Sequence, residues 1–424
     1  MTSVLMQYKS TLNRWGLKKN PFRVVPPHKP ELVAKLFVGR NNVIQKAIIP
    51  AYDGRNVLIL GPWGIGKTAT IRYLLHKLFV EMEELGDDGF LLYISMSGAR
   101  TQSDFYRGLA LGLANILTPY TETAQEIASN LQGFKYNKSP LVFSGRVSLG
   151  IFSIGFEHHP QRGLTINENI NENVDRYVYY WSNRLIEKAL ELRSHLIVAI
   201  DDLDKKDPDV IHEILESGMG LFRNEDNISF IMSGRSFATH TQEQVIRVQG
   251  VFSENIELTT MNERDLYLMS IKYLNSVREE TSDDPFPFTE NVLSRISKEA
   301  QGVPRQQQVI CEKTVKLAAE QGLPLIDSRS FTKIWREIQK QVIYSLDKNQ
   351  RAILYKILEF EGIGEDISVL ELDALNVPTF LQIIPVLKTF EEKGLLVPVT
   401  DGNTLHYKPS NLAKILREQG EIKG

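Results

Sequence analysis

The stretch Gly61-Pro62-Trp63-Gly64-Ile65-Gly66-Lys67-Thr68 comes directly after a short apolar run, Asn56 to Leu60, and directly before a segment with the periodicity of a helix. It matches the pattern G-x-x-x-x-G-K-[ST], which requires a strand before it and a helix after it. The glycines allow successive backbone N–H groups to turn toward one anion, and the N-terminus of the following helix adds a positive field. The stretch therefore predicts a loop that binds the phosphates of a nucleotide.

Two side chains at the end of this loop have distinct predicted roles. We expect Lys67 to reach the β- and γ-phosphate oxygens of ATP, and Thr68 to be a ligand of Mg²⁺. ATP and Mg²⁺ are therefore the predicted cofactors. The expected nucleotide-binding residues of the loop are Gly61, Pro62, Trp63, Gly64, Ile65, Gly66, Lys67, Thr68 and Ala69.

A second apolar run, His195 to Ile200, ends in two carboxylates, Asp201 and Asp202. We expect Asp201 to hold Mg²⁺ through water, because the other side of the metal needs an acidic group at the end of a buried strand. Asp202 is then the candidate group that orients or deprotonates the attacking water. Together the two stretches predict an ATPase.

The composition allows two or three domains and excludes several classes of protein. The chain has 424 residues, and its hydrophobic fraction of 42% and charged fraction of 24% are ordinary. No long apolar run predicts a membrane span, and Met1 to Lys9 lacks the features of a signal peptide, so we expect a cytoplasmic protein. The single cysteine, Cys311, excludes an internal disulfide framework.

The net charge of −3 gives no overall nucleic-acid signal, but residues 1–30 contain six basic side chains and no acidic one. These are Lys9, Arg14, Lys18, Lys19, Arg23 and Lys29. We interpret residues 1–30 as a basic N-terminal arm and a Pro-rich, extended tether.

Besides Asn56 to Leu60, four apolar runs predict buried strands, and the helical patterns between them predict an αβα sandwich with a parallel sheet. The runs are Phe90 to Ile94, His195 to Ile200, Ile228 to Met232 and Asn255 to Leu258. The expected ATPase core spans residues 31–260 and contains an insert at about 120–175, where we predict a β-hairpin over Val147 to Glu157.

After Met261 the pattern becomes helical, with a predicted N-cap at Asn262 and further helix starts at Pro304 and after Asp327. We interpret residues 261–343 as a helical lid. Residues 344–424 show three short helices and then two extended runs joined by Asp401-Gly402, which predicts a winged-helix domain. The predicted fold class is therefore α/β: a P-loop NTPase αβα sandwich, followed by a helical lid and a C-terminal winged-helix domain.

The segment Phe37-Val38-Gly39-Arg40 resembles the F-x-G-R box of initiator-type AAA+ ATPases, the origin-recognition and cell-division-control initiators, and of the related STAND NTPases. In that family the box lines the adenine pocket, so the resemblance implies that Val38, Gly39 and Arg40 contact the base. The resemblance covers roughly residues 20–320 and, beyond them, the winged-helix tail.

Two further stretches are similar to the sensor motifs of that family. Ile231-Met232-Ser233-Gly234-Arg235 looks like the sensor-1 strand and implies a polar role for Ser233, whereas Gly302-Val303-Pro304-Arg305 looks like the sensor-2 motif. Arg305 would then reach the γ-phosphate and make the lid position depend on that phosphate. The candidates for an arginine that acts on a neighbouring subunit are Arg223 and Arg235.

The chain departs from the family pattern in two places. The usual Asp-Glu pair is Asp201-Asp202 here, which shortens the candidate base by one methylene. Because a misplacement of about 1 Å can cost on the order of a hundredfold in rate, we expect slow hydrolysis and a long-lived ATP state. The second departure is the long insert between Arg100 and Val174, for which the resemblance implies no role.

Two interpretations of the target remain open. In the first, ATP-loaded subunits form a homo-oligomer on DNA, as an initiator-like loader or a transposition-regulator-like protein. In the second, the ATP-dependent oligomer of a STAND-type signalling or antiviral switch engages a protein effector. The basic arm and the winged helix together favour DNA, although residues 345–424 hold nine Lys/Arg against twelve Asp/Glu.

Overall fold

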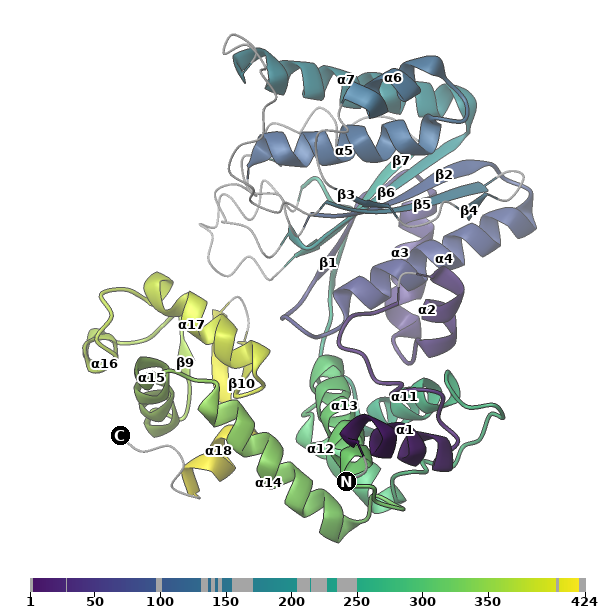
Figure 1. The fold of residues 1–424 in the computed structure, drawn as a ribbon. Coiled ribbons are helices and arrows are strands. Elements are labelled where there is room, and N and C mark those ends of the chain that lie inside the picture. The colour runs from purple at the N-terminus through teal and green to yellow at the C-terminus, as the bar shows by residue number, and fades with distance from the viewer. Residues whose placement is uncertain are drawn as a thin grey trace.

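The structure is a computed structural model of the chain, and it contains a sheet covered by helices, a helical lid and a small C-terminal domain (Figure 1). The residues that it describes are 3–27, 29–96, 101–130, 136–138, 142–143, 147–154, 171–203, 214, 227–234, 250–401 and 404–418. Over those residues, no helix combines the length and the apolar character that crossing a membrane needs.

The large sheet has the strand order β3-β5-β2-β6-β7-β1-β8, and its strands from β5 to β8 run parallel. The strands that position the site are β1 (Val57–Leu60), β2 (Gly89–Ser95), β6 (His195–Asp201), β7 (Ile228–Gly234) and β8 (Glu254–Glu257). Every residue of β1, β2 and β7 is buried, as expected for parallel strands with both faces covered. The predicted strands are therefore confirmed, and their carboxyl ends share one edge of the sheet.

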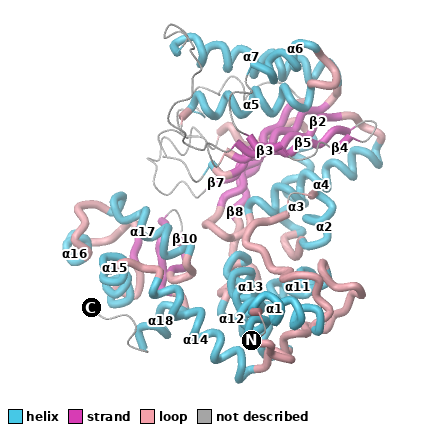
Figure 2. The backbone as a smooth tube through the Cα atoms, viewed as in Figure 1, coloured by secondary structure: helices cyan, strands magenta, loops and turns pink. Residues whose placement is uncertain are grey.

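Helices cover both faces of this sheet (Figures 1 and 2). One layer holds α3 (Asn41–Tyr52) and α4 (Lys67–Leu85), and the other holds α5 (Gln102–Leu117), α6 (Glu122–Asn130) and α7 (Asn171–Leu192). Along β2, Leu91 and Tyr93 belong to the core under α4, whereas Leu92 and Ile94 belong to the core under α5. This alternation confirms the predicted αβα sandwich.

The predicted hairpin over Val147 to Glu157 is wrong. Residues 147–154 form one continuous strand, β5 (Val147–Ile154), which pairs in parallel with β2 along its length and extends the main sheet. The short strands β3 (Tyr136–Lys138) and β4 (Val142–Phe143) pair antiparallel with it. The weak alternation comes from one strand that buries Val147 and Leu149 in the core under α4, and Gly150 lies within the strand opposite Leu92 instead of in a turn.

The lid consists of four helices, and three of them begin where the sequence predicts, after Asn262, at Pro304 and after Asp327. The four helices are α11 (Glu263–Asn275), α12 (Glu290–Glu299), α13 (Pro304–Glu320) and α14 (Ser328–Tyr344). The side chain of Asn262 accepts a hydrogen bond from the N–H of Asp265, which confirms the predicted cap, and Asp327, after which a helix was predicted, caps α14 through the N–H of Ser330. Helix α14 leads away from the lid to the C-terminal domain (Figure 1).

The N-terminal segment packs against the lid. Its helix α1 (Val4–Arg14) contacts α13, and the following α2 (Pro30–Leu36) contacts α4. Trp15, Leu17 and Phe22 are buried in the core of the lid, and the indole Nε1 of Trp15 donates to the Pro324 carbonyl at 3.0 Å. The six basic side chains remain exposed. The basic segment is thus a surface of the lid in this structure, not a free arm.

The C-terminal domain has the winged-helix order of one helix, a strand, two helices and a two-stranded wing. Its small sheet has the order β10-β11-β9. The elements are α15 (Lys348–Glu359), β9 (Ile363–Gly364), α16 (Val369–Ala374), α17 (Phe380–Glu392), β10 (Leu396–Asp401), β11 (Thr404–Pro409) and α18 (Asn411–Glu418). Together with the αβα sandwich and the helical lid, this domain confirms the predicted fold class.

Candidate nucleotide-binding site

The loop between β1 and α4 has the backbone shape that a phosphate site needs. Gly64 and Gly66 have φ angles of +78° and +105°, which side chains with a Cβ rarely adopt, and Gly66 directly precedes α4. The N–H of Gly61 donates to the Gly234 carbonyl at 3.2 Å and so ties the loop to the end of β7. The loop is therefore anchored at the sheet edge, with the N-terminus of a 19-residue helix behind it.

Lys67 points back into this loop. Its Nζ donates to the carbonyls of Gly61 at 2.8 Å and Pro62 at 3.2 Å, and the residue is only 7% exposed. Thr68 and Ala69 follow it in the first turn of α4. A buried ammonium at this point can exchange a loop carbonyl for a phosphate oxygen over a short movement of a flexible side chain.

Two acidic side chains and a serine meet one strand away from the loop. The Oγ of Ser233, on β7, donates to Oδ1 of Asp201 and accepts the N–H of Asp202 at 3.3 Å. Asp202 Oδ2 accepts the Oγ–H of Ser95 at 2.7 Å. Because β7 lies between β1 and β6, the acidic strand end and the phosphate loop share one edge of the sheet.

The residues present fit a magnesium–nucleotide complex. Mg²⁺ prefers oxygen ligands and is held by one or two carboxylates together with substrate phosphates. Asp201 supplies a carboxylate, and Thr68 supplies a hydroxyl beside the loop. In the part of the chain that the structure describes, no three His, Cys, Asp or Glu side chains gather as a metal site of their own. A metal at this edge would therefore take its remaining ligands from phosphate oxygens and water.

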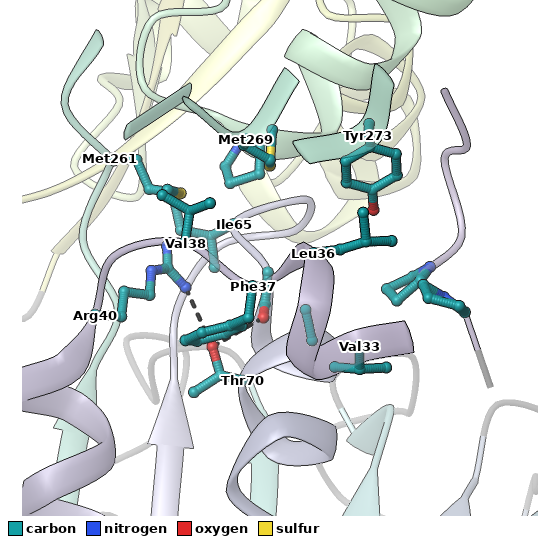
Figure 3. Close-up of a pocket in the computed structure, with 15 residues that line it drawn as sticks. Val33, Leu36, Phe37, Val38, Arg40, Ile65, Thr70, Met261, Met269 and Tyr273 are labelled. Atoms are coloured by element: carbon teal, nitrogen blue, oxygen red, sulfur yellow. Dashed lines mark hydrogen bonds between the residues drawn. The ribbon is translucent and has the colours of Figure 1, made fainter. Parts of the chain in front are cut away.

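An apolar pocket lies beside the loop, between the sheet domain and the lid (Figure 3). Val38 and Arg40 line it, as the resemblance implies for a base pocket. Arg40 donates to Thr70 Oγ1 at 3.5 Å and to the Thr259 carbonyl at 3.1 Å, and burial lowers its pKa to about 10. The other lining residues are Pro26, Pro27, Val33, Leu36, Phe37, Ile65, Gly66, Ala69, Thr70, Met261, Met269, Tyr273 and Pro304.

Gly39 does not line the pocket. It has a φ of +68°, and a Cβ at this position would lie 2.9 Å from a carboxylate oxygen of Asp265. The positive φ explains a glycine in the F-x-G-R box, because residues with a Cβ rarely adopt this conformation, whereas the carboxylate of Asp265 is a side-chain end that can move.

Arg305 lies directly against the phosphate loop. Its backbone N–H donates to the Gly64 carbonyl at 3.2 Å, and its guanidinium lies over the Trp63 ring, 3.5 Å from the centroid. A Cβ on Gly64 would come within 3.0 Å of the Arg305 Cβ, so the glycine lets the lid approach. Burial lowers the pKa of Arg305, while the nearby carboxylates of Glu392 and Glu391 oppose this shift.

A carboxylate from the winged-helix domain also reaches the loop. The Trp63 N–H donates to Oε1 of Glu391 at 2.9 Å, and Glu391 lies in the last turn of α17 and is 3% exposed. Gln306 Nε2, on α13, donates to the Glu391 carbonyl at 3.3 Å. The Trp63 amide, which belongs to the candidate phosphate loop, therefore donates to an anionic side chain in this structure.

The structure therefore brings the loop, the acidic pair, Ser233 and Arg305 together. The remaining candidates, Arg223 and Arg235, lie outside the described residues. The residues at the site that sequence reasoning missed are Arg72, Tyr93, Ser95 and Glu391. The only sequence signal for Tyr93 and Ser95 was a polar group within or at the end of an apolar run, and no local pattern joins Glu391 to a loop 328 positions away.

Comparisons with known proteins give distant matches. No family model matches the chain. An uncharacterized HTH-type transcriptional regulator of Methanocaldococcus jannaschii is 21% identical over 427 residues, covering 96% of this chain and 94% of that protein.

Solved structures of similar fold include two initiator proteins and a DNA motor. The Aeropyrum pernix ORC1 protein in complex with DNA has 14% identity and a TM-score of 0.46, with 96% of both chains covered. Cdc6p of Pyrobaculum aerophilum has 14% identity and a TM-score of 0.41, covering 97% of this chain and 99% of that one. The RuvB Holliday junction branch migration motor of Thermotoga maritima has 15% identity and a TM-score of 0.44, covering 91% and 95%.

Proposed function

We propose that this protein is an ATP-dependent switch that binds and slowly hydrolyses ATP with Mg²⁺, and that the bound nucleotide controls its assembly into a homo-oligomer on DNA. The contact between Glu391 and the Trp63 N–H carries the proposal. A phosphate and this carboxylate compete for the same amide, so the bound nucleotide and the position of the winged helix depend on each other. Arg305, which lies on the same tryptophan, extends this dependence to the lid.

The positions of the side chains support the following assignment of roles. The loop amides and Lys67 bind the phosphates, Thr68 and Asp201 hold the metal, and Asp202 orients or deprotonates the attacking water. Mg²⁺ at such a site neutralises charge that develops on the phosphate oxygens. Because Asp202 already accepts a hydrogen bond from Ser95 and is one methylene shorter than a glutamate, it is restrained and hydrolysis is slow.

DNA is the target that the charge distribution favours. The exposed Lys18 and Lys19 follow α1 on the lid, so a lid that moves with the nucleotide would move this basic surface too. The Methanocaldococcus jannaschii relative is named as an HTH-type transcriptional regulator, which agrees with a DNA target. Helix α17, by contrast, has its C-terminal end turned to the phosphate loop, so DNA binding by α17 would require the domain to move.

The first prediction concerns the winged-helix contact. Glu391→Gln keeps the shape and a neutral acceptor but removes the charge, and charge-assisted hydrogen bonds are about twice as strong as neutral ones. If the loss of charge weakens the hydrogen bond between residue 391 and the Trp63 amide by about 1 kcal/mol, the affinity for an ATP analogue should rise about fivefold. Equilibrium binding of a fluorescent ATP analogue measures this.

Glu392→Gln is the matched control, because it removes the same charge from the next, exposed residue of the same helix. Equal gains in both variants would indicate a general charge effect and contradict competition at the Trp63 amide. Unchanged affinity in Glu391→Gln would contradict it as well. Measuring the size of the Glu391→Gln variant in solution, with ADP and with the ATP analogue, then shows whether release of the winged-helix domain permits assembly.

The second prediction tests the DNA target. Deletion of residues 1–30 would remove Trp15 and Phe22 from the lid core, so charge removal is the sharper experiment. Replacing both Lys18 and Lys19 with Gln should lower the slope of log K against log salt by about 2, since each phosphate contact contributes about 1. The control is Arg184→Gln with Lys188→Gln on α7, which removes two exposed charges elsewhere. If the wild-type protein with ATP does not retain DNA even at low salt, the DNA target is wrong and a protein effector is favoured.

A further inference from the structure

A chain of buried hydrogen bonds runs from the wall of the base pocket to the acidic strand end. Arg72, on α4, donates through Nη1 to the carbonyls of Pro26 and Pro27, both at 3.0 Å. Its Nη2 donates to the Tyr93 hydroxyl at 3.3 Å, and that hydroxyl donates to Oδ2 of Asp201 at 2.7 Å. The two prolines line the base pocket, so the chain joins the two ends of the candidate nucleotide site.

The side chains of this chain of hydrogen bonds are buried, and hydrogen bonds between buried groups are strong and costly to lose. Arg72 is 6% exposed, and Tyr93 and Asp201 are each 1% exposed. The Arg72 guanidinium also lies over the Tyr93 ring, 4.7 Å from the centroid.

This chain of hydrogen bonds fixes the direction of each group in it. Proline restricts its own backbone φ, so two successive prolines hold their carbonyls in a stiff arrangement toward one guanidinium. The planar fork of an arginine offers several donors in fixed directions, which a lysine does not. At the far end, Tyr93 takes one oxygen of the Asp201 carboxylate and Ser233 takes the other, so the carboxylate cannot rotate freely.

We propose that Tyr93 and Arg72 are positioning residues for the metal side of the site, and that they link the carboxylate of Asp201 to the Pro26-Pro27 wall of the base pocket. This inference rests on the proposed function and adds two residues to it. Hydrogen-bond partners that orient a metal-binding carboxylate commonly change metal affinity by about 10- to 100-fold when removed. Through these hydrogen bonds, a nucleotide base that contacts the two prolines and a metal ion held near Asp201 favour each other's binding.

Tyr93→Phe tests the tyrosine, because it keeps the buried ring and removes only the hydroxyl. A fluorescent ATP analogue is bound to the full-length protein first in EDTA and then with increasing Mg²⁺. We expect the affinity in EDTA to stay within about twofold, while the Mg²⁺ concentration for half of the metal-dependent tightening rises about 10- to 100-fold. Arg72→Met, which keeps an extended side chain without donors, should shift the Mg²⁺ response in the same direction.

The double variant tests the link itself. If the two residues act through one chain, Tyr93→Phe with Arg72→Met should need no more Mg²⁺ than the worse single variant, whereas independent effects would multiply. Tyr52→Phe is the matched control, since the Tyr52 hydroxyl donates to Oδ2 of Asp87 at 2.6 Å, which is the same pairing away from the site. Thermal unfolding confirms that each variant is folded.

Three outcomes would overturn the proposal. An unchanged Mg²⁺ response in Tyr93→Phe would exclude a positioning role, and an equal loss of affinity in EDTA would show that the hydroxyl only supports the fold. Multiplying effects in the double variant would exclude the link. A wild-type protein that fails to bind the analogue in either condition would instead contradict the proposed function on which this inference rests.

Discussion

Lys67→Ala should abolish the retention of ATP, with a loss of affinity of about 10²- to 10³-fold. Lys67 is 7% exposed, so its ammonium and a bound phosphate would pair largely out of water. Removing one partner of such a buried, hydrogen-bonded charge pair costs about 2–5 kcal/mol, and each 1.4 kcal/mol is tenfold in affinity. Equilibrium binding of a fluorescent ATP analogue with Mg²⁺ measures the loss.

The same helix offers a control for charge and for helix stability. Lys77 is a half-buried lysine of α4 whose Nζ lies 3.0 Å from Glu81, so Lys77→Ala removes an equal charge ten residues further along the chain. This variant should bind the analogue like the wild-type protein. If Lys67→Ala retains the analogue, or if both variants lose it equally, the loop does not bind phosphate through Lys67.

Local patterns predicted the parts of this site that are contiguous in the chain. The glycine-rich loop after a buried strand and the two aspartates at the end of another were sufficient to place both at one sheet edge, because parallel strands share their carboxyl ends. The caps at Asn262 and Asp327 were predictable for a similar reason, since each contact spans three residues. Patterns within a single helix, strand or loop were therefore enough to predict most of the fold.

The sequence could not predict contacts that only the packing of domains creates. Glu391 reaches Trp63 because α17 docks on the loop, and Arg72 meets Tyr93 because α4 packs on β2. The hairpin predicted over Val147 to Glu157 failed for a related reason: a strand that pairs with the distant β2 looks locally like one arm of a turn. Similarly, a run of basic residues with prolines suggested a basic arm and an extended tether, whereas buried side chains such as Trp15 and Phe22 hold this segment on the lid.

Asp202→Asn should leave ATP binding unchanged within about twofold and slow single-turnover hydrolysis by about 10²- to 10³-fold, in the range that general base catalysis supplies. Asparagine is the informative replacement because Asp202 has a φ of +68°, a left-handed conformation that Asn tolerates and that Ala adopts only at a cost of about 1–2 kcal/mol. The amide oxygen can still accept the Ser95 hydroxyl, so the loop should keep its shape. What is lost is the negative charge that attracts the proton of the attacking water.

The contrast with Ser95→Ala makes this prediction specific. That variant removes the 2.7 Å hydrogen bond to Asp202 and keeps the carboxylate, so it removes one restraint on the candidate base instead of neutralising it. If the restraint by Ser95 contributes to slow turnover, Ser95→Ala should hydrolyse ATP at least as fast as the wild-type protein, while Asp202→Asn is slow. Normal single-turnover rates in Asp202→Asn would show that another group activates the water, and the shortened acidic pair would then not explain a long-lived ATP state.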